Sequence, residues 1–328
     1  MHFLSTILIA NLKATNHMEA IKMKQHVKKK KSPLEKGKTV FLIVFLTIPV
    51  INFLVFWLYV NFESFLNAFR IEVYGDVVFS FDNWVYFWEE ISGKNPFSTT
   101  PMLFRNTLKF FSLNLFAILP LSFFFSYFLY KKIRFYKYYR LIFFLPNIIS
   151  AAVLATLYKF ILNPSLGGIV PTIVELFGGE PINYLIDERY AMNAVLVYCL
   201  WTGFSVNMII FNGAMGRVPY EVMEAAQIDG VGFWSEIGRI IIPMTWPTLS
   251  TIIVTTVANI FVSSGPILLL TQGDCDTSTI AYWIYLTTKN QLSIYYPSTV
   301  AFACTVVSVP LVLLVKKLVG LLWTDVSY

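Results

Sequence analysis

Charged residues are scarce in this sequence of 328 residues, and that scarcity excludes most soluble folds. Asp, Glu, Lys and Arg make up 13% of the chain, whereas soluble domains carry roughly 25%. Hydrophobic residues make up 56%, and the mean hydropathy is +0.64. So little charge cannot cover a water-facing surface, and we therefore predict an all-α polytopic membrane protein. The formal charge of +6 does not indicate nucleic-acid binding, because membrane topology accounts for where the basic residues lie.

Histidine, cysteine and phosphate-binding glycine motifs are also too few for an enzyme site. The three histidines (His2, His17 and His26) all lie near the N-terminus, so none is available within the membrane. The three cysteines have neither metal-ligand spacing nor a disulfide pattern; they are Cys199, Cys275 and Cys304. The sequence contains no Gly-x-x-x-x-Gly-Lys phosphate loop. We therefore expect no catalytic residue, no metal and no cofactor in this chain.

Residues 1–38 form a basic tail with nine lysines, including the run Lys28 to Lys31. Its apolar start is too short to span a bilayer. We predict a cytoplasmic tail that also touches anionic lipid, followed by a membrane domain over 39–328. One hypothesis is that translation begins at Met18 or Met23 rather than at Met1.

Six segments reach the length of about 20 apolar residues that a bilayer demands. They lie at 39–60, 106–130, 141–162, 191–212, 247–270 and 296–317. In the fifth, Gly265-Pro266 should bend or break the helix, and a break in a spanning helix is tolerated where it lines a cavity.

The distribution of Lys and Arg orients these segments, because cytoplasmic connections carry an excess of both. The tail has nine, and 131–140 has five with no acid. The alternate connections are acidic on balance, namely 61–105, 163–190 and 271–295. Both termini and the 213–246 loop should therefore be cytoplasmic.

That loop carries a polar, helix-forming motif between two apolar runs. Pro219 suits the start of a short helix and Gly230 the position just beyond its end. The motif residues are Glu224, Ala225, Ala226, Asp229 and Gly230, with Pro243 thirteen positions further on. The small alanines permit close approach by a partner, and the two acids can pair with basic groups.

This spacing resembles the cytoplasmic loop of ABC importer permeases. Asn106-Thr107, Leu270 to Gly273 and Pro247 resemble motifs of the sugar-type branch, which is maltose- and glycerol-phosphate-like. The resemblance implies six transmembrane helices, with a coupling helix between helices 4 and 5 that docks on an ATP-hydrolysing subunit. It further implies a bacterial plasma-membrane location, with two ATPase subunits that bind ATP and Mg. The other partners would be a second permease in a heterodimer and an extracytoplasmic solute-binding protein.

A pathway for a polar solute should be lined by uncharged hydrogen-bonding groups, because buried charge is costly in a bilayer. The candidates on the fourth and fifth segments are Trp201, Asn207, Asn212, Asn259, Ser263 and Ser264. An equally good interpretation is that these side chains hydrogen-bond between helices. A permease for an amino acid or peptide, or a membrane scaffold without transport activity, also stays open as an alternative.

Overall fold

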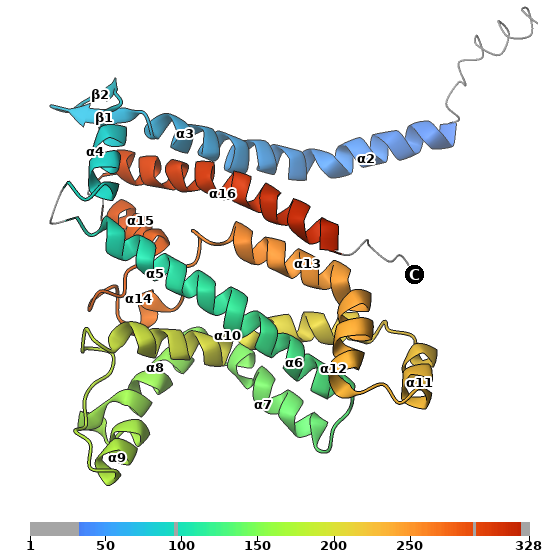
Figure 1. Cartoon of the computed structure of the whole chain (residues 1–328). Coiled ribbons are helices and arrows are strands. Elements are labelled where there is room, and N and C mark those ends of the chain that lie inside the picture. Colours follow the sequence, from blue (N-terminus) through green and yellow to red (C-terminus); the bar gives the residue numbers. More distant parts are fainter. Residues whose placement is uncertain (1–32, 95–97, 291–292, 323–328) are drawn as a thin grey trace, which may run out of the picture. The chain divides into compact units, whose positions relative to one another are not determined.

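The computed structural model describes residues 33–94, 98–290 and 293–322, in two compact units. The first unit ends at Glu63 and the second begins at Ser64. Most of the basic tail lies outside the described residues, as do the lysine run and the three possible start positions. Figure 1 labels the helices and strands.

The first unit is a long apolar helix. It comprises α2 (Pro33–Asn52), the π-helix η1 (Phe53–Tyr59) and the start of α3 (Val60–Asn67). The candidate span Val40–Asn67 overlaps the first predicted segment, 39–60. No residue in its most apolar stretch is buried. An apolar helix exposed all round is stable in lipid rather than in water.

The second unit opens with a small β-hairpin and a short helix. Strands β1 (Arg70–Val73) and β2 (Asp76–Phe79) pair antiparallel, so the fold departs from an all-α one at this point. The turn residues Tyr74 and Gly75 have φ of 53° and 92°, as a two-residue hairpin with a right-handed twist requires. Helix α4 (Asp82–Ile91) follows and packs against α16 (Tyr295–Leu322).

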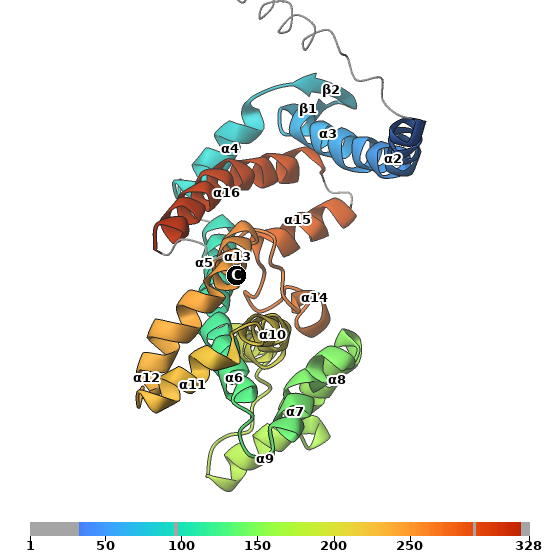
Figure 2. The same ribbon diagram turned by 90° about the vertical axis from the view of Figure 1, so that its right-hand side faces the viewer.

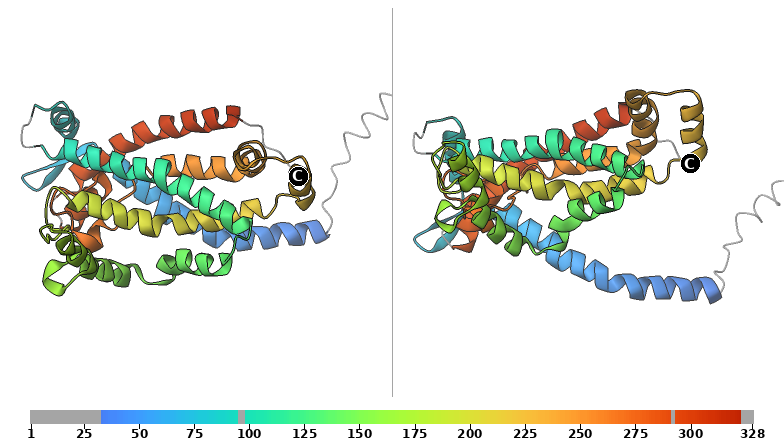
Figure 3. Two further views of the ribbon diagram at one scale, coloured as in Figure 1. Left: turned by 60° about the horizontal axis from the view of Figure 1, so that its bottom comes forward. Right: turned by 90° about the horizontal axis from the view of Figure 1, so that it is seen from below.

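Four long helical stretches form the body of this unit (Figures 1 and 3). The first joins α5 (Thr100–Leu113), the π-helix η2 (Asn114–Ile118) and α6 (Leu119–Tyr130). The second is α10 (Ala191–Met215), and the fourth is α16. The third joins α12 (Phe233–Glu236), the π-helix η4 (Ile237–Ile241) and α13 (Ile242–Ala258).

Serines allow α6 and α10 to pack closely. The Ser122 hydroxyl donates to the Phe204 carbonyl at 2.9 Å, and the Ser126 hydroxyl donates to the Met208 carbonyl at 2.9 Å. Both serines are fully buried. Small hydroxylated residues at a helix interface are typical of membrane proteins, because they shorten the approach of two backbones and hydrogen-bond across it.

The third predicted segment, 141–162, is not a single straight helix. It is a pair, α7 (Tyr136–Ile148) and α8 (Ala151–Leu162), bent by 103°. Ile149 and Ser150 between them have ψ of 140° and 136°, so the backbone is extended at the bend. Among the residues that the structure describes, five helices are long and apolar enough to cross a membrane, and the bent pair counted as one span makes six. The predicted six-span architecture is confirmed on that count.

The fifth predicted segment, 247–270, is displaced. The spanning helix runs over Phe233–Ala258, and irregular turns replace the helix from Asn259 to Pro266. Gly265 has φ of 52° and Pro266 lacks an N–H, so neither continues a helix. The predicted break at Gly265-Pro266 is real, and it lies beyond the span rather than within it.

Shorter helices cap the two ends of the second unit. Helices α9 (Ile169–Leu176), α14 (Ile267–Leu270) and α15 (Ile280–Lys289) lie at the same end as α4. Helix α11 (Tyr220–Ile228) lies at the opposite end, next to α12 (Figure 1). Figure 2 shows α7 and α8 on the far side of α10 from α16.

Candidate coupling loop and solute pathway

Helix α11 forms from the motif that the sequence singled out. Pro219 precedes it with ψ of 137°, and Gly230 follows it with φ of 67°. The Val231 N–H donates to the Ala226 carbonyl at 3.0 Å, and the Gly230 N–H donates to the Gln227 carbonyl at 3.1 Å. This is the Schellman ending, in which glycine occupies the left-handed position without strain.

One face of α11 packs on the rest of the chain and the other is exposed. Met223 and Ala226 are buried, and Met223 joins an apolar cluster with Phe211, Met215 and Ile241. The exposed positions include Glu224, Ala225, Asp229 and Gly230. Of the predicted ATPase contacts, Ala226 therefore faces its own chain, and Pro243 lies half-buried in the first turn of α13.

A partly buried ion pair ties the segment after α11 to the end of α6. The Lys131 Nζ lies 2.6 Å from the Glu236 Oε1, and the Tyr127 hydroxyl donates to the same oxygen at 3.0 Å. Glu236 is 7% exposed. Phe233 packs beside it, with its ring stacked on Phe128 at 6.0 Å between centroids. In the sequence, Lys131 is one of the five basic residues of 131–140 that predict a cytoplasmic location for this connection. The sequence clue to its pairing is that Glu236 is an acid at the start of an apolar helix.

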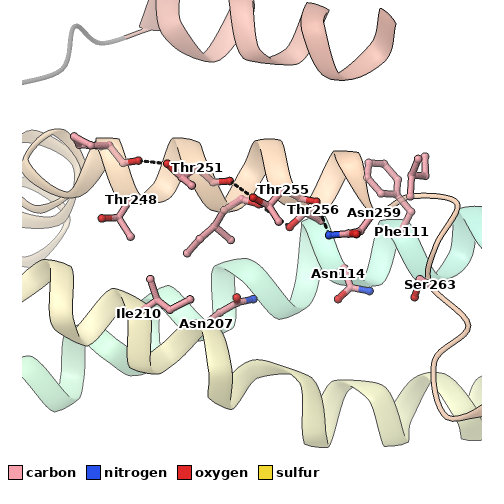
Figure 4. Close-up of a pocket in the computed structure, with 13 residues that line it drawn as sticks. Phe111, Asn114, Asn207, Ile210, Thr248, Thr251, Thr255, Thr256, Asn259 and Ser263 are labelled. Carbon is pink, nitrogen blue, oxygen red and sulfur yellow. Dashed lines mark hydrogen bonds between the residues drawn. The ribbon is translucent and has the colours of Figure 1, made fainter. Parts of the chain in front are cut away.

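A cavity of about 550 Å³ lies between α5–η2, α10, α13 and the turn that follows α13 (Figure 4). Its polar lining residues are all uncharged. They are Asn114, Asn207, Thr248, Thr251, Thr255, Thr256, Asn259 and Ser263. A cavity of this size among spanning helices can hold a small polar molecule.

The structure brings together half of the predicted pathway residues. Asn207, Asn259 and Ser263 line the cavity, whereas Asn212, Ser264 and Trp201 do not. Trp201 is exposed, with its ring 6.1 Å from that of Tyr198.

The threonines and Asn114 also line the cavity, although they were not among the predicted pathway residues. Thr248, Thr251, Thr255 and Asn259 follow one another at intervals of three or four residues, which puts them on one helical face, and Thr256 lies next to Thr255. This spacing could have predicted a polar face on the helix from the sequence alone. Asn114 begins a π-helical turn, which is a feature frequent at functional sites and one that the sequence does not show.

A second cavity of about 570 Å³ lies against α8 and α10. Asn114 and Ser263 line both cavities. These two residues therefore stand between the two spaces, on η2 and on the turn after α13.

At the α4 end, a loop is fastened to α5. The Asn106 amide nitrogen donates to the carbonyls of Asp276 at 2.6 Å and Ser278 at 2.9 Å. Beside it the Thr107 hydroxyl accepts from the Ile280 N–H at 3.1 Å. The Asn-Thr pair of the sequence therefore holds the loop between α14 and α15. In the part of the chain that the structure describes, no three His, Cys, Asp or Glu side chains converge to hold a metal ion.

A helical protein with six candidate spans and a polar cavity among them is a membrane protein of the transporter class. The chain belongs to the family of binding-protein-dependent transport system inner membrane components, whose model matches residues 118–327. The family predicted from the sequence is thereby confirmed, and the chain is a multi-pass transport component.

The chain is similar to known transport proteins in sequence and to a solved structure in fold. The galactooligosaccharides transport system permease protein GanP of Bacillus subtilis is 24% identical over 265 residues, which cover 77% of this chain and 58% of GanP. A probable ABC transporter permease protein of Pyrococcus horikoshii is 30% identical over 202 residues, covering 60% of this chain and 68% of that protein. The chain thus spans less than two thirds of the length of GanP.

The solved structure is a bacterial ABC transporter involved in the import of the acidic polysaccharide alginate. Its matching chain is 21% identical with a TM-score of 0.72, and the match covers 88% of this chain and 98% of that chain. This likeness establishes the fold.

Proposed function

We propose that the chain is the permease subunit of a bacterial ABC importer and moves a sugar or oligosaccharide by alternating access. The observation that carries this proposal is the cavity between α5, α10 and α13, because its polar lining suits a hydroxyl-rich solute. GanP, named for galacto-oligosaccharides, supports the same solute class. Separate ATPase subunits that bind ATP and Mg would drive the cycle.

The α11 end would face the cytoplasm and meet an ATPase subunit. The exposed residues Glu224, Ala225, Asp229 and Gly230 would form the contact. Ala226 and Pro243 would act indirectly, since Ala226 fixes the packed face of α11 and Pro243 lies in the helix that receives its motion. Exposed Tyr220 and Ile228 would add apolar contact area to the same surface.

The partners would be those of a binding-protein-dependent importer. A second permease would form a heterodimer with this chain, two ATPase subunits would dock on the cytoplasmic side, and an extracytoplasmic solute-binding protein would deliver the solute. Both termini would be cytoplasmic, with the basic tail beside anionic lipid.

The test is solute-stimulated ATP hydrolysis by the assembled complex in proteoliposomes, with Gly230→Asp beside wild type. At φ of 67° an aspartate costs about 1 kcal/mol and adds a charge at the docking surface, so we expect assembly with at least tenfold lower stimulation. Gly232→Asp is the matched control, because it places the same charge at the N-cap of α12, where aspartate is favoured. Full stimulation in Gly230→Asp would refute coupling through α11, and lack of any co-purifying ATPase subunit would refute the importer itself.

A further inference from the structure

We propose that the cavity between α5, α10 and α13 selects an uncharged, hydroxyl-rich solute and excludes an anionic one. This inference rests on the proposed function, and it adds the charge of the solute, which the comparisons leave open. The galacto-oligosaccharides in the name of GanP are neutral, whereas the alginate in the description of the structural neighbour is acidic.

The first step is the absence of a cation. Among the residues that the structure describes around this cavity, no Lys or Arg is present. Lys109 is near in sequence, but it is turned roughly 170° around α5 from the face of Phe111 and Asn114 at 100° per residue. Its side chain is exposed on that other face.

The second step is the state of the threonine hydroxyls on α13. The hydroxyl of Thr255 donates to the Thr251 carbonyl at 2.8 Å, and that of Thr256 donates to the Ile252 carbonyl at 2.8 Å. Thr251 donates likewise to the Pro247 carbonyl at 2.7 Å (Figure 4). A hydroxyl has one proton and two lone pairs, so each of these groups keeps only acceptor capacity for a ligand.

The third step is the hydrogen bonding of the asparagines on the cavity wall. The Asn259 amide nitrogen donates to the Thr255 carbonyl at 3.0 Å, and that of Asn114 donates to the Phe110 carbonyl at 2.9 Å. A backbone carbonyl only accepts, so the nitrogen faces it, which leaves the side-chain oxygen and the second N–H of each amide for other partners. The cavity wall therefore offers neutral acceptors and neutral donors, including the amide of Asn207 and the hydroxyls of Thr248 and Ser263, and it offers no cation among the described residues.

A wall of neutral hydrogen-bonding groups without a cation discriminates by charge. Sugar hydroxyls can donate to the threonine and asparagine oxygens. A carboxylate or phosphate would lose its hydration and find only neutral donors on this wall, with no positive partner from the described part of this chain to offset the cost.

The experiment compares uptake of matched solutes by the complete complex in proteoliposomes. The panel pairs galactotriose with trigalacturonate, and the gluco and manno trisaccharides with their uronate counterparts. We expect uptake of a neutral member at least tenfold faster than that of its uronate. Comparable or faster uptake of a uronate would overturn the inference, whereas ATP-dependent uptake of no member would refute the proposed function instead.

Variants then tie the selectivity to this wall. Thr255→Val and Thr256→Val keep the shape and remove the oxygen, so each should slow uptake of the neutral solute about threefold to tenfold. Thr305→Val on α16 is the control, because Thr305 makes the same bond to a carbonyl four residues back at 2.9 Å and does not line the cavity. Wild-type uptake in both cavity variants, with the control also normal, would show that the wall does not contact the solute.

Discussion

Asn106 is a single residue that joins segments about 170 positions apart in the sequence. Its amide nitrogen donates to two carbonyls of the loop between α14 and α15, at 2.6 and 2.9 Å, and the residue is fully buried. Two of the loop residues, Gln272 and Cys275, have φ of 55° and 53°, a conformation that costs non-glycine residues free energy. The bonds from Asn106 help to hold the loop in that conformation.

Asn106→Asp should therefore destabilise the protein although the side chains have the same shape. A carboxylate cannot donate, and its charge would face two carbonyl oxygens in a buried site, so we expect a loss of about 3 kcal/mol in the free energy of unfolding. Thermal unfolding of the detergent-solubilised chain, followed by tryptophan fluorescence, measures this. Asn193→Asp is the control, since Asn193 is exposed in the first turn of α10, where an acid is favoured. Equal midpoints for the two variants would contradict the role of Asn106.

At the scale of elements, the ion pair between Lys131 and Glu236 joins the end of α6 to α12. Lys131→Met should leave the buried Glu236 carboxylate with only the Tyr127 hydroxyl, which we expect to cost about 2–3 kcal/mol. Because 26% of the Lys131 side chain is exposed, we expect this loss in the free energy of unfolding to be smaller than for a fully buried pair. Because removing the charge from both partners leaves no unpaired ion, Lys131→Met with Glu236→Gln should recover most of the loss.

A double-mutant cycle on the same detergent-solubilised protein checks this. The coupling free energy between the two positions should be at least 1 kcal/mol, on the order that contacting charged residues show. Additive effects of the two substitutions would mean that the pair does not join α6 to α12 in solution.

The sequence predicts whole elements well where one physical signal decides them. Hydropathy places both ends of four spans to within seven residues, and Pro219 and Gly230 delimit α11 because each suits one end of a helix. Hydropathy does not report backbone direction, so the 103° bend at Ile149 and the early end of α13 could not be read from it. The cavity depends on three helices meeting, so the sequence predicted only three of its polar lining residues, Asn207, Asn259 and Ser263, although the threonine spacing on α13 was also visible in it.

At the scale of the whole molecule, the orientation in the membrane is a prediction from the Lys and Arg counts. Cys275 reports it directly. This thiol lies in the loop between α14 and α15, where it donates to the Ile186 carbonyl at 3.0 Å. Cys304 is buried and Cys199 is half-buried, both in spanning helices. A membrane-impermeant maleimide should therefore label Cys275 in intact spheroplasts. In a Cys275→Ser background, Ile228→Cys on α11 should be labelled only after permeabilisation, and the reverse pattern would invert the proposed topology.

The pH dependence of that labelling tests the surroundings of Cys275. Burial raises the pKa of the Cys275 thiol, and the neighbouring carboxylates of Asp274 and Glu188 raise it further. Only the thiolate reacts, so below the pKa the rate should rise about tenfold per pH unit. An ordinary thiol, with a pKa of about 8.5, levels off near pH 9, whereas Cys275 should still gain rate above that pH. Asp274→Asn removes one carboxylate and should move the profile to lower pH, while Asp82→Asn on α4 should leave it unchanged. If the labelling rate of wild-type Cys275 levels off at the same pH as that of a free thiol, the loop does not shield Cys275.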